Sequence, residues 1–166
     1  MSQALAVPPR SKSSIVNPML LSHGTLTCKN LVNSRRFYEE FLGLEVVRHA
    51  RPAMMLRLGT GMYVVAVCIG EGVPNQHVLT HWGVNVATRA EVDRAHAEAH
   101  RLKGEYGIQK INKVLERHGA YGFYFQDLDN NWWEIQHEPR AIDDFFDRGD
   151  IVDASVVATD SAESHE

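Results

Sequence analysis

The sequence has little of what marks several classes of protein. Only two of its 166 residues are cysteines, Cys28 and Cys68, which excludes a disulfide-stabilised scaffold and favours two buried thiols. No apolar run approaches the roughly 20 residues that cross a bilayer. The first residues also lack a basic stretch followed by an apolar core. We therefore expect a cytoplasmic protein without membrane contact.

An excess of positive charge is also absent. The chain has 17 Lys and Arg against 21 Asp and Glu, a net charge of −4. Because a general nucleic-acid binder needs a basic surface for phosphates, this balance argues against nucleic acid as a partner. What stands out instead is nine histidines, since histidine is the commonest metal-ligand side chain.

The two ends of the chain differ in composition from its middle. Residues 1–18 carry no hydrophobic period and are predicted to be a flexible arm. Residues 140–166 predict a short helix, at 141–146, followed by an acidic and disordered tail. The folded part is then residues 19–139, which is close to the commonest size for one domain.

Within the folded part the same order of signals occurs twice, in modules 19–72 and 77–139. Each module predicts a strand, a helix and then three strands. The strands are expected at 20–28, 44–49, 54–58 and 62–69, and at 78–86, about 106–111, 120–126 and 132–137. Asn33 and Thr88 are the predicted N-caps of the two helices, and Gly43 and Gly104 their predicted ends. A unit this small cannot bury its own sheet, so the two modules are expected to share one core.

Two histidines and one glutamate are the candidate metal ligands. His23 and His81 occupy equivalent places, early in the first strand of each module and 58 residues apart. Glu134 lies in the last strand between two large apolar residues, where a carboxylate needs a partner because burying a bare charge is costly. Two imidazoles and one carboxylate are the ligands of non-haem Fe(II) oxygenases. His77, four residues before His81, is the alternative second ligand.

Three stretches of sequence carry a resemblance to a known family. They are SHGTL at 22–26 with FYEEFLGLEV at 37–46, THWGVNV at 80–86, and FYFQDLDNNWWEI at 123–135. The chain resembles the vicinal oxygen chelate superfamily, which contains glyoxalases, bleomycin-resistance proteins and extradiol dioxygenases. It departs from the family pattern at Leu128, where proline is usual, and at Asn130, where glycine is usual. Asparagine tolerates positive φ better than most residues, so we expect the turn to be kept.

The resemblance implies a fold and a site. The fold is α+β, with two βαβββ modules forming a half-open mixed β-barrel around a metal held by His23, His81 and Glu134. The resemblance is closest to single-module extradiol dioxygenases, because the strand at 62–69 has no acidic residue, whereas glyoxalase I-like enzymes take a further carboxylate there. His118 and Tyr124 resemble the dioxygenase signature, with one residue too few between His118 and the Phe-Tyr pair.

The function implied by this resemblance is ring cleavage of a catechol-like vicinal diol with O₂. Fe(II) is the expected metal, with Mn(II), Ni(II) or Zn(II) as alternatives. Tyr124 would bind a substrate oxygen, and His118 would move a proton or orient the substrate. The family also implies a homodimer or a higher homo-oligomer. Two other functions stay open: a metal-dependent lyase, isomerase or thiol transferase that needs no O₂, and a non-catalytic protein that binds an aromatic ligand or an antibiotic.

Overall fold

The computed structural model describes residues 15, 20–59 and 61–148, so most of the predicted arm and tail lies outside the described residues. The first module contains β1 (His23–Cys28), α1 (Leu31–Arg36), η1 (Phe37–Phe41), β2 (Glu45–Ala50), β3 (Ala53–Arg57), β4 (Tyr63–Cys68) and η2 (Gly70–Gly72). The second contains β5 (His81–Asn85), α2 (Arg89–Arg101), α3 (Lys103–Tyr106), β6 (Lys110–Ile111), β7 (Leu115–Arg117), β8 (Ala120–Gln126) and β9 (Trp132–His137), and is followed by α4 (Ile142–Arg148).

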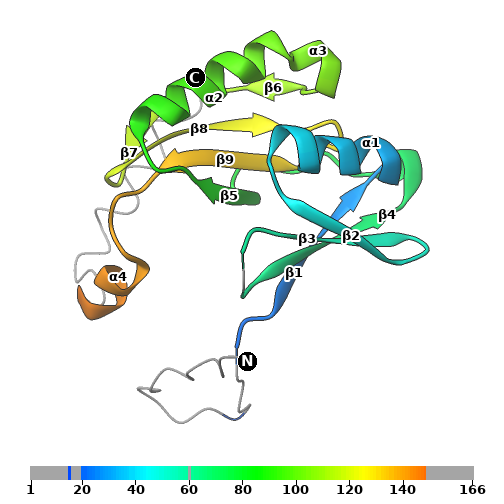
Figure 1. Ribbon diagram of the computed structural model, residues 1–166, viewed down its shortest axis with the longest axis horizontal. Helices are drawn as coiled ribbons and strands as arrows, with labels where there is room; N and C mark the ends of the chain where they lie inside the picture. Colours follow the sequence, from blue (N-terminus) through cyan, green and yellow to red (C-terminus); the bar gives the residue numbers. More distant parts are fainter. Residues whose placement is uncertain (1–14, 16–19, 60, 149–166) are drawn as a thin grey trace.

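Each module builds its own mixed sheet (Figure 1). The first has the strand order β1-β4-β3-β2, and the second has the order β5-β9-β8-β6, with β7 also paired to β8. The first strand of each module runs parallel to the last, β1 to β4 and β5 to β9, while the other pairs are antiparallel. The predicted α+β class and the two-module arrangement are confirmed. In the described part of the chain neither sheet closes into a barrel.

The two modules share one core, as the repeat predicted. α1 and η1 of the first module lie beside the second sheet (Figure 1), and their aromatic side chains pack on it. The ring centroids of Phe37 and Phe125 are 6.2 Å apart, and those of Tyr38 and Trp133 are 5.7 Å apart. All four side chains are at most 2% exposed. Burial of rings of this size is the main apolar contribution to joining the modules.

The turn between β8 and β9 is a second connection between the modules. The Asp129 carboxylate accepts hydrogen bonds from Lys29 N at 2.7 Å and Ser34 Oγ at 2.5 Å, both in the first module. Asn131 Nδ2 donates to Thr27 O at 2.9 Å. These partners lie about a hundred positions away along the chain. The turn therefore anchors the second module to the end of β1 and the start of α1.

Asp127 holds the same turn in shape from inside. Its side chain is fully buried and accepts hydrogen bonds from the backbone N–H groups of Asp129 and Asn131 and from Trp133 Nε1. Burial, with the nearby charge of Asp129, raises the pKa of Asp127 to about 7, against the opposing effect of these donors. Asn130 has a φ of 65°, so this asparagine adopts the left-handed conformation as expected.

Some predicted element boundaries are wrong. The first helix is capped by Asn30, whose side chain accepts from Val32 N and Asn33 N, so Asn33 lies inside the helix. In the second module the predicted strand at 106–111 is replaced by α3, which ends at Tyr106, and by the two-residue β6. The reason is Gly107, whose φ of 67° provides the left-handed helix end that the prediction placed at Gly104.

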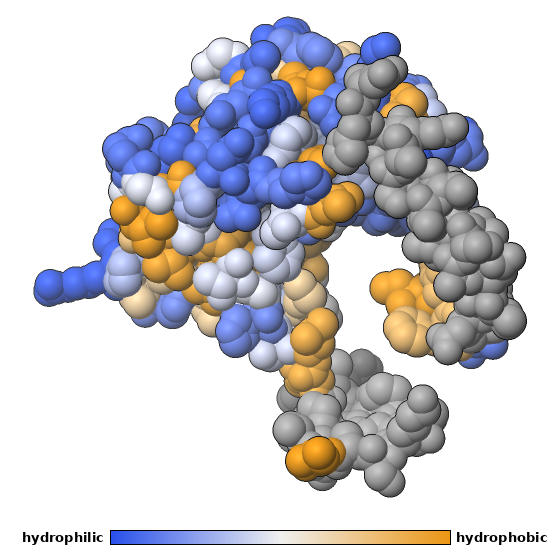
Figure 2. Space-filling model, turned by 180° about the vertical axis from the view of Figure 1, so that it is seen from behind, coloured by the Kyte–Doolittle hydropathy of each residue, from blue (hydrophilic) through white to orange (hydrophobic). Residues whose placement is uncertain are grey.

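The predicted C-terminal helix is present as α4, and it stands away from the body of the molecule in the view from behind (Figure 2). Arg140 lies over the Phe145 ring at 4.5 Å, whereas Phe146 is 79% exposed and so does not pack back onto the body. No helix in the described part of the chain is both long and apolar enough to span a membrane.

Candidate metal site

Three of the predicted site residues lie together on the face of the second sheet that points away from α2. His81 begins β5, Glu134 is in the middle of β9, and Tyr124 is its direct neighbour on β8. Because side chains alternate along a strand, the apolar neighbours Phe123 and Ile135 point to the opposite face and are buried. The alternation that fills the core therefore leaves the polar residues on the open face.

His81 and Glu134 have the geometry of two metal ligands. His81 Nε2 is 3.4 Å from Glu134 Oε2, and ligands bound at about 2.1 Å to one metal lie roughly 3.0–3.4 Å apart. His81 Nδ1 is 2.8 Å from Val78 O. A carbonyl only accepts, so Nδ1 carries a proton, and in the neutral ring the lone pair is on Nε2, the atom that faces the carboxylate. A backbone carbonyl behind a histidine is the usual support of a metal-binding imidazole, so these two residues fit a divalent cation.

Tyr124 completes this group from the neighbouring strand. Its ring lies 4.8 Å from the His81 ring in an edge-on arrangement. Burial, a hydrogen bond to Glu134 and the charge of Glu134 raise the pKa of Tyr124 to about 12. The phenol therefore stays protonated at neutral pH and is a hydrogen-bond donor. A small cavity of about 30 Å³ adjoins Tyr124 and Glu134, with room for about one water molecule.

His23 occupies the equivalent place in the other sheet. It is exposed at the start of β1, where its ring stacks on Tyr63 of β4 at 5.3 Å and Ser22 Oγ lies 2.9 Å from its Nδ1. Among the residues that the structure describes, no group of three or more His, Cys, Asp or Glu could hold a metal ion. The single chain therefore brings His81 and Glu134 together but does not add His23 to them.

The remaining two candidates lie outside this group. His77 is in the loop before β5, where its Nδ1 accepts from Leu79 N at 3.2 Å. His118 is exposed in the turn between β7 and β8, with a φ of 53°. Ala120, the first residue of β8, is four positions and about 13 Å from Tyr124 along the strand, and His118 lies in the turn before Ala120.

Two further residues lie beside this site, and their roles there were not predicted from the sequence. Trp82, next to His81, packs on Gly24, next to His23, and a Cβ on Gly24 would lie 1.8 Å from the Trp82 ring. Only glycine permits this approach, which fixes β5 against β1. Arg117 lies in the wall of the small cavity and opposes the rise in the pKa of Tyr124 through its charge. Nothing in the local sequence distinguishes Arg117 from an ordinary exposed arginine.

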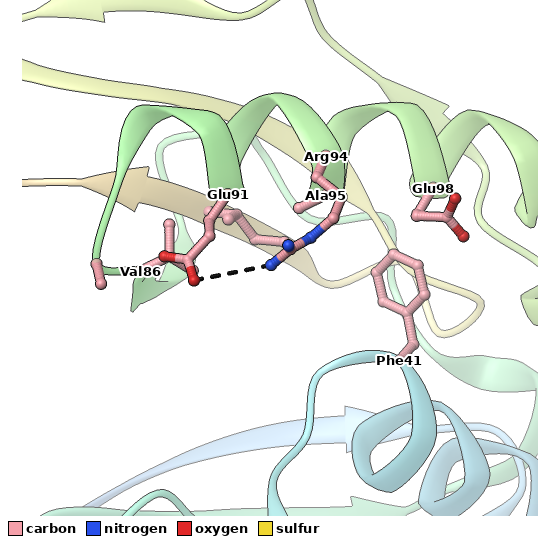
Figure 3. A pocket seen from close by; sticks show the side chains of 8 residues that line it. Phe41, Val86, Glu91, Arg94, Ala95 and Glu98 are labelled. Carbon is pink, nitrogen blue, oxygen red and sulfur yellow. Dashed lines mark ion pairs between the residues drawn. The ribbon is translucent and has the colours of Figure 1, made fainter.

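A larger cavity, of about 360 Å³, lies on the other side of the second sheet between η1 and α2. Figure 3 shows Phe41 of η1 opposite α2, and the long ion pair of 3.7 Å between Arg94 and Glu91 along the helix. The lining of this cavity includes Ile135, which points away from the face that carries Glu134. This cavity is therefore separate from the candidate metal site.

Comparisons with known proteins agree with this fold. No curated protein matches the sequence. The FosX fosfomycin resistance protein of Listeria monocytogenes, solved with Mn(II) and a sulfate ion, is similar with a TM-score of 0.57 and 19% identity over 77% of this chain and 95% of that one. FosX of Mesorhizobium loti has a TM-score of 0.54 and 21% identity over 75% and 94%. A glyoxalase/bleomycin resistance protein of Albidiferax ferrireducens has a TM-score of 0.56 and 19% identity over 72% and 98%.

At these identities the solved structures show a shared fold alone. The sequence evidence is independent, because the family profile matches residues 20–135, most of the chain. That range contains both predicted histidine ligands and Glu134. The chain therefore belongs to the Glyoxalase/Bleomycin resistance protein/Dioxygenase superfamily.

Proposed function

We propose that this protein is a divalent-metal-dependent enzyme that acts on a small substrate with oxygen atoms on two neighbouring atoms. The reaction does not use O₂. The observation that carries the proposal is the pairing of His81 Nε2 with Glu134 Oε2 at 3.4 Å, with Nδ1 of the imidazole held by Val78 O. When bound, a divalent metal would supply Lewis-acid chemistry to a substrate oxygen. Tyr124, kept protonated by burial and by Glu134, would donate a hydrogen bond to an oxygen that gains negative charge.

The third ligand, His23, is supplied in this proposal by a second copy of the chain. The open face of the first sheet carries His23, and the open face of the second carries His81 and Glu134. Within one described chain these residues do not form one group. A dimer that places the first sheet of each copy against the second sheet of the other would complete two identical sites.

Complementation between variants tests this arrangement. His23→Ala and His81→Ala should each abolish metal binding in a pure homodimer. A refolded equal mixture should regain about a quarter of the wild-type sites, because half of the dimers are mixed and each has one complete site. The mixture of His81→Ala with Glu134→Gln is the control, since it leaves no complete site. No recovery in the first mixture would overturn the shared site.

The choice of Lewis-acid chemistry rests on two observations. His118, the expected proton-moving residue of a dioxygenase, lies in the turn before β8, whose first residue, Ala120, is already about 13 Å from Tyr124 along the strand. Two similar structures are fosfomycin resistance proteins, one of them solved with Mn(II). Fosfomycin is therefore the first substrate to test, together with water or a thiol as the second reactant.

An Fe(II) extradiol dioxygenase is the second candidate. It is favoured by the open face of β4, where Tyr63, Val65 and Val67 are in register with the His23 side of β1 and provide no further carboxylate. A site of two histidines and one glutamate would then result, which is the ligand set of non-haem Fe(II) oxygenases. Catechol-like diols are the substrates that this candidate requires.

One set of assays separates the candidates. The metal-free protein is loaded with Mn(II), or with Fe(II) under anaerobic conditions. Fosfomycin turnover is followed by phosphorus NMR, and O₂ uptake is measured over a panel of catechols. Turnover with Mn(II) and no O₂ uptake supports the proposal, whereas uptake that needs Fe(II) and a catechol replaces it with the second candidate. Tight binding of an aromatic ligand by metal-free protein, with no turnover in either assay, indicates a non-catalytic binding protein.

A further inference from the structure

Helix α2 carries two neighbouring histidines, on the opposite side of the second sheet from His81 and Glu134. His96 and His100 are four residues apart, so they lie on one face of the helix. Their ring centroids are 4.7 Å apart. The His96 ring also packs edge-on against Phe123 at 4.9 Å, on the buried face of β8. This pair is therefore distinct from the candidate metal site.

His96 is held in the state that a metal requires. Its Nε2 is 3.0 Å from the backbone oxygen of Asn112. Because a carbonyl can only accept, Nε2 carries the proton and the lone pair of the neutral ring is on Nδ1. This contact is the same kind of support that metal-binding histidines usually have behind them. Packing on Phe123 restricts the ring further, so less side-chain entropy is lost on binding.

His100 provides the accessible half of the pair. It is exposed on the outer surface of α2, one helical turn after His96. We propose that His96 and His100 together bind a divalent transition metal of the class that prefers imidazole, which includes Cu(II), Ni(II) and Zn(II). In the described chain no third His, Cys, Asp or Glu joins them, so water would complete the coordination and the metal would exchange. This inference does not rest on the proposed enzymatic function.

Titration with Cu(II) alone tests the site, because Cu(II) binds such ligands most tightly of these metals. All variants are made in a chain that carries His81→Ala, here called the background, because this change removes the candidate metal site. The same variants are also titrated with His81 present, after the first equivalent of metal has been added. His100→Gln should weaken binding at α2 by about tenfold or more, since the second imidazole no longer acts at high effective concentration. Electron paramagnetic resonance should show two nitrogen ligands before the change and one after it.

A spacing variant gives the matched control. Ala97→His combined with His100→Gln keeps the number of histidines but places them at i and i+1, where their side chains do not face each other. It should bind Cu(II) as weakly as His100→Gln. His49→Gln, on exposed β2, should leave binding unchanged. Circular dichroism checks that α2 is intact, and His96→Gln is the second variant if the double substitution unfolds.

Equal Cu(II) affinity in the background and in the spacing variant would overturn the proposal, because the metal would then not need the i, i+4 pair. Equal affinity in the background and in His96→Gln would do the same. Cu(II) binding that is weaker by about tenfold or more in the spacing variant and in His96→Gln, with His49→Gln unchanged, supports it.

Discussion

At the scale of single residues, the candidate site depends on hydrogen bonds that fix the state of each side chain. Val78 O sets the proton of His81 on Nδ1, and Glu134 accepts from the Tyr124 phenol. The residue types at these positions were predictable from the sequence, because a histidine and a glutamate in apolar strands need partners. Val78 as the orienting group was not, since a backbone carbonyl carries no sequence signal.

Tyr124→Phe should separate metal binding from catalysis. The change removes only the hydroxyl, so metal affinity should stay the same while kcat falls by about 100-fold, the usual effect of removing one donor to a developing negative charge. Metal affinity from calorimetry and kcat from the assay that reports activity are the measurements. Glu134→Gln is the comparison and should lose metal. If Tyr124→Phe loses metal equally, the phenol serves only to position Glu134.

Gly24→Ala should destabilise the contact between β1 and β5. The added Cβ would lie 1.8 Å from the Trp82 ring. We therefore expect the free energy of unfolding, measured by urea denaturation, to fall by about 1–3 kcal/mol. Gly83→Ala is the control, because nothing lies within 4 Å of a Cβ there. Trp82→Leu should reduce the cost of Gly24→Ala. An equal cost with and without Trp82 would show that the ring is not the cause.

At the scale of elements, the turn between β8 and β9 does more than reverse the chain. Asp129 reaches Lys29 and Ser34 in the first module, while Asp127 is enclosed by donors of its own turn. The sequence predicted a turn here because Asp and Asn favour turns. It could not predict the partners, because no local pattern links positions about a hundred residues apart.

Unfolding should depend on pH through Asp127. Its pKa is raised to about 7 in the folded protein, above the ordinary value near 4. Between these two values the folded protein keeps a proton on Asp127 that the unfolded chain has released. The contribution of Asp127 to stability is therefore complete below about pH 4 and is lost as pH rises through 7. For this group alone we expect on the order of 3 kcal/mol less stability at pH 8 than at pH 5.

Urea unfolding at both pH values measures this effect. Asp127→Asn cannot titrate, so the difference between pH 5 and pH 8 should shrink, although the variant is less stable throughout because an amide accepts fewer hydrogen bonds. Asp129, whose pKa burial also raises, should leave a smaller difference of the same sign. An unchanged difference in the variant would exclude Asp127 as its source.

The helix boundaries show where local signals are insufficient. The strands at 120–126 and 132–137 agree with the prediction residue for residue, because alternation and a flanking turn mark them clearly. Asn30 and Asn33 are equally good caps by residue type, and Gly104 and Gly107 are equally good helix ends. The choice between them depends on backbone geometry that only the packed structure determines.

At the scale of the whole molecule, the main feature is that each of the two sheets leaves one face open. The family resemblance implied a half-open barrel built from two modules, and in the described chain each module forms its own mixed sheet, neither of which closes. One row across the first sheet pairs Val47 with Met55, Met55 with Val65, and Val65 with Thr25, on the same face as His23. Val47 is 57% exposed there. This apolar row gives the proposed dimer a surface to cover.

Val47→Lys should therefore break the dimer without unfolding the chain. Lysine at an exposed strand position costs a single chain little, but a charge buried in an interface without a partner is strongly unfavourable. Sedimentation over a range of concentrations should show a dimer in the parent chain and a monomer in the variant, and metal affinity should fall with dimer content. Val32→Lys is the matched control, because Val32 is 76% exposed on α1, away from the open face. A dimer that survives Val47→Lys but dissociates with Val32→Lys would place the contact on the helices, where the second copy could not bring His23 to His81 and Glu134.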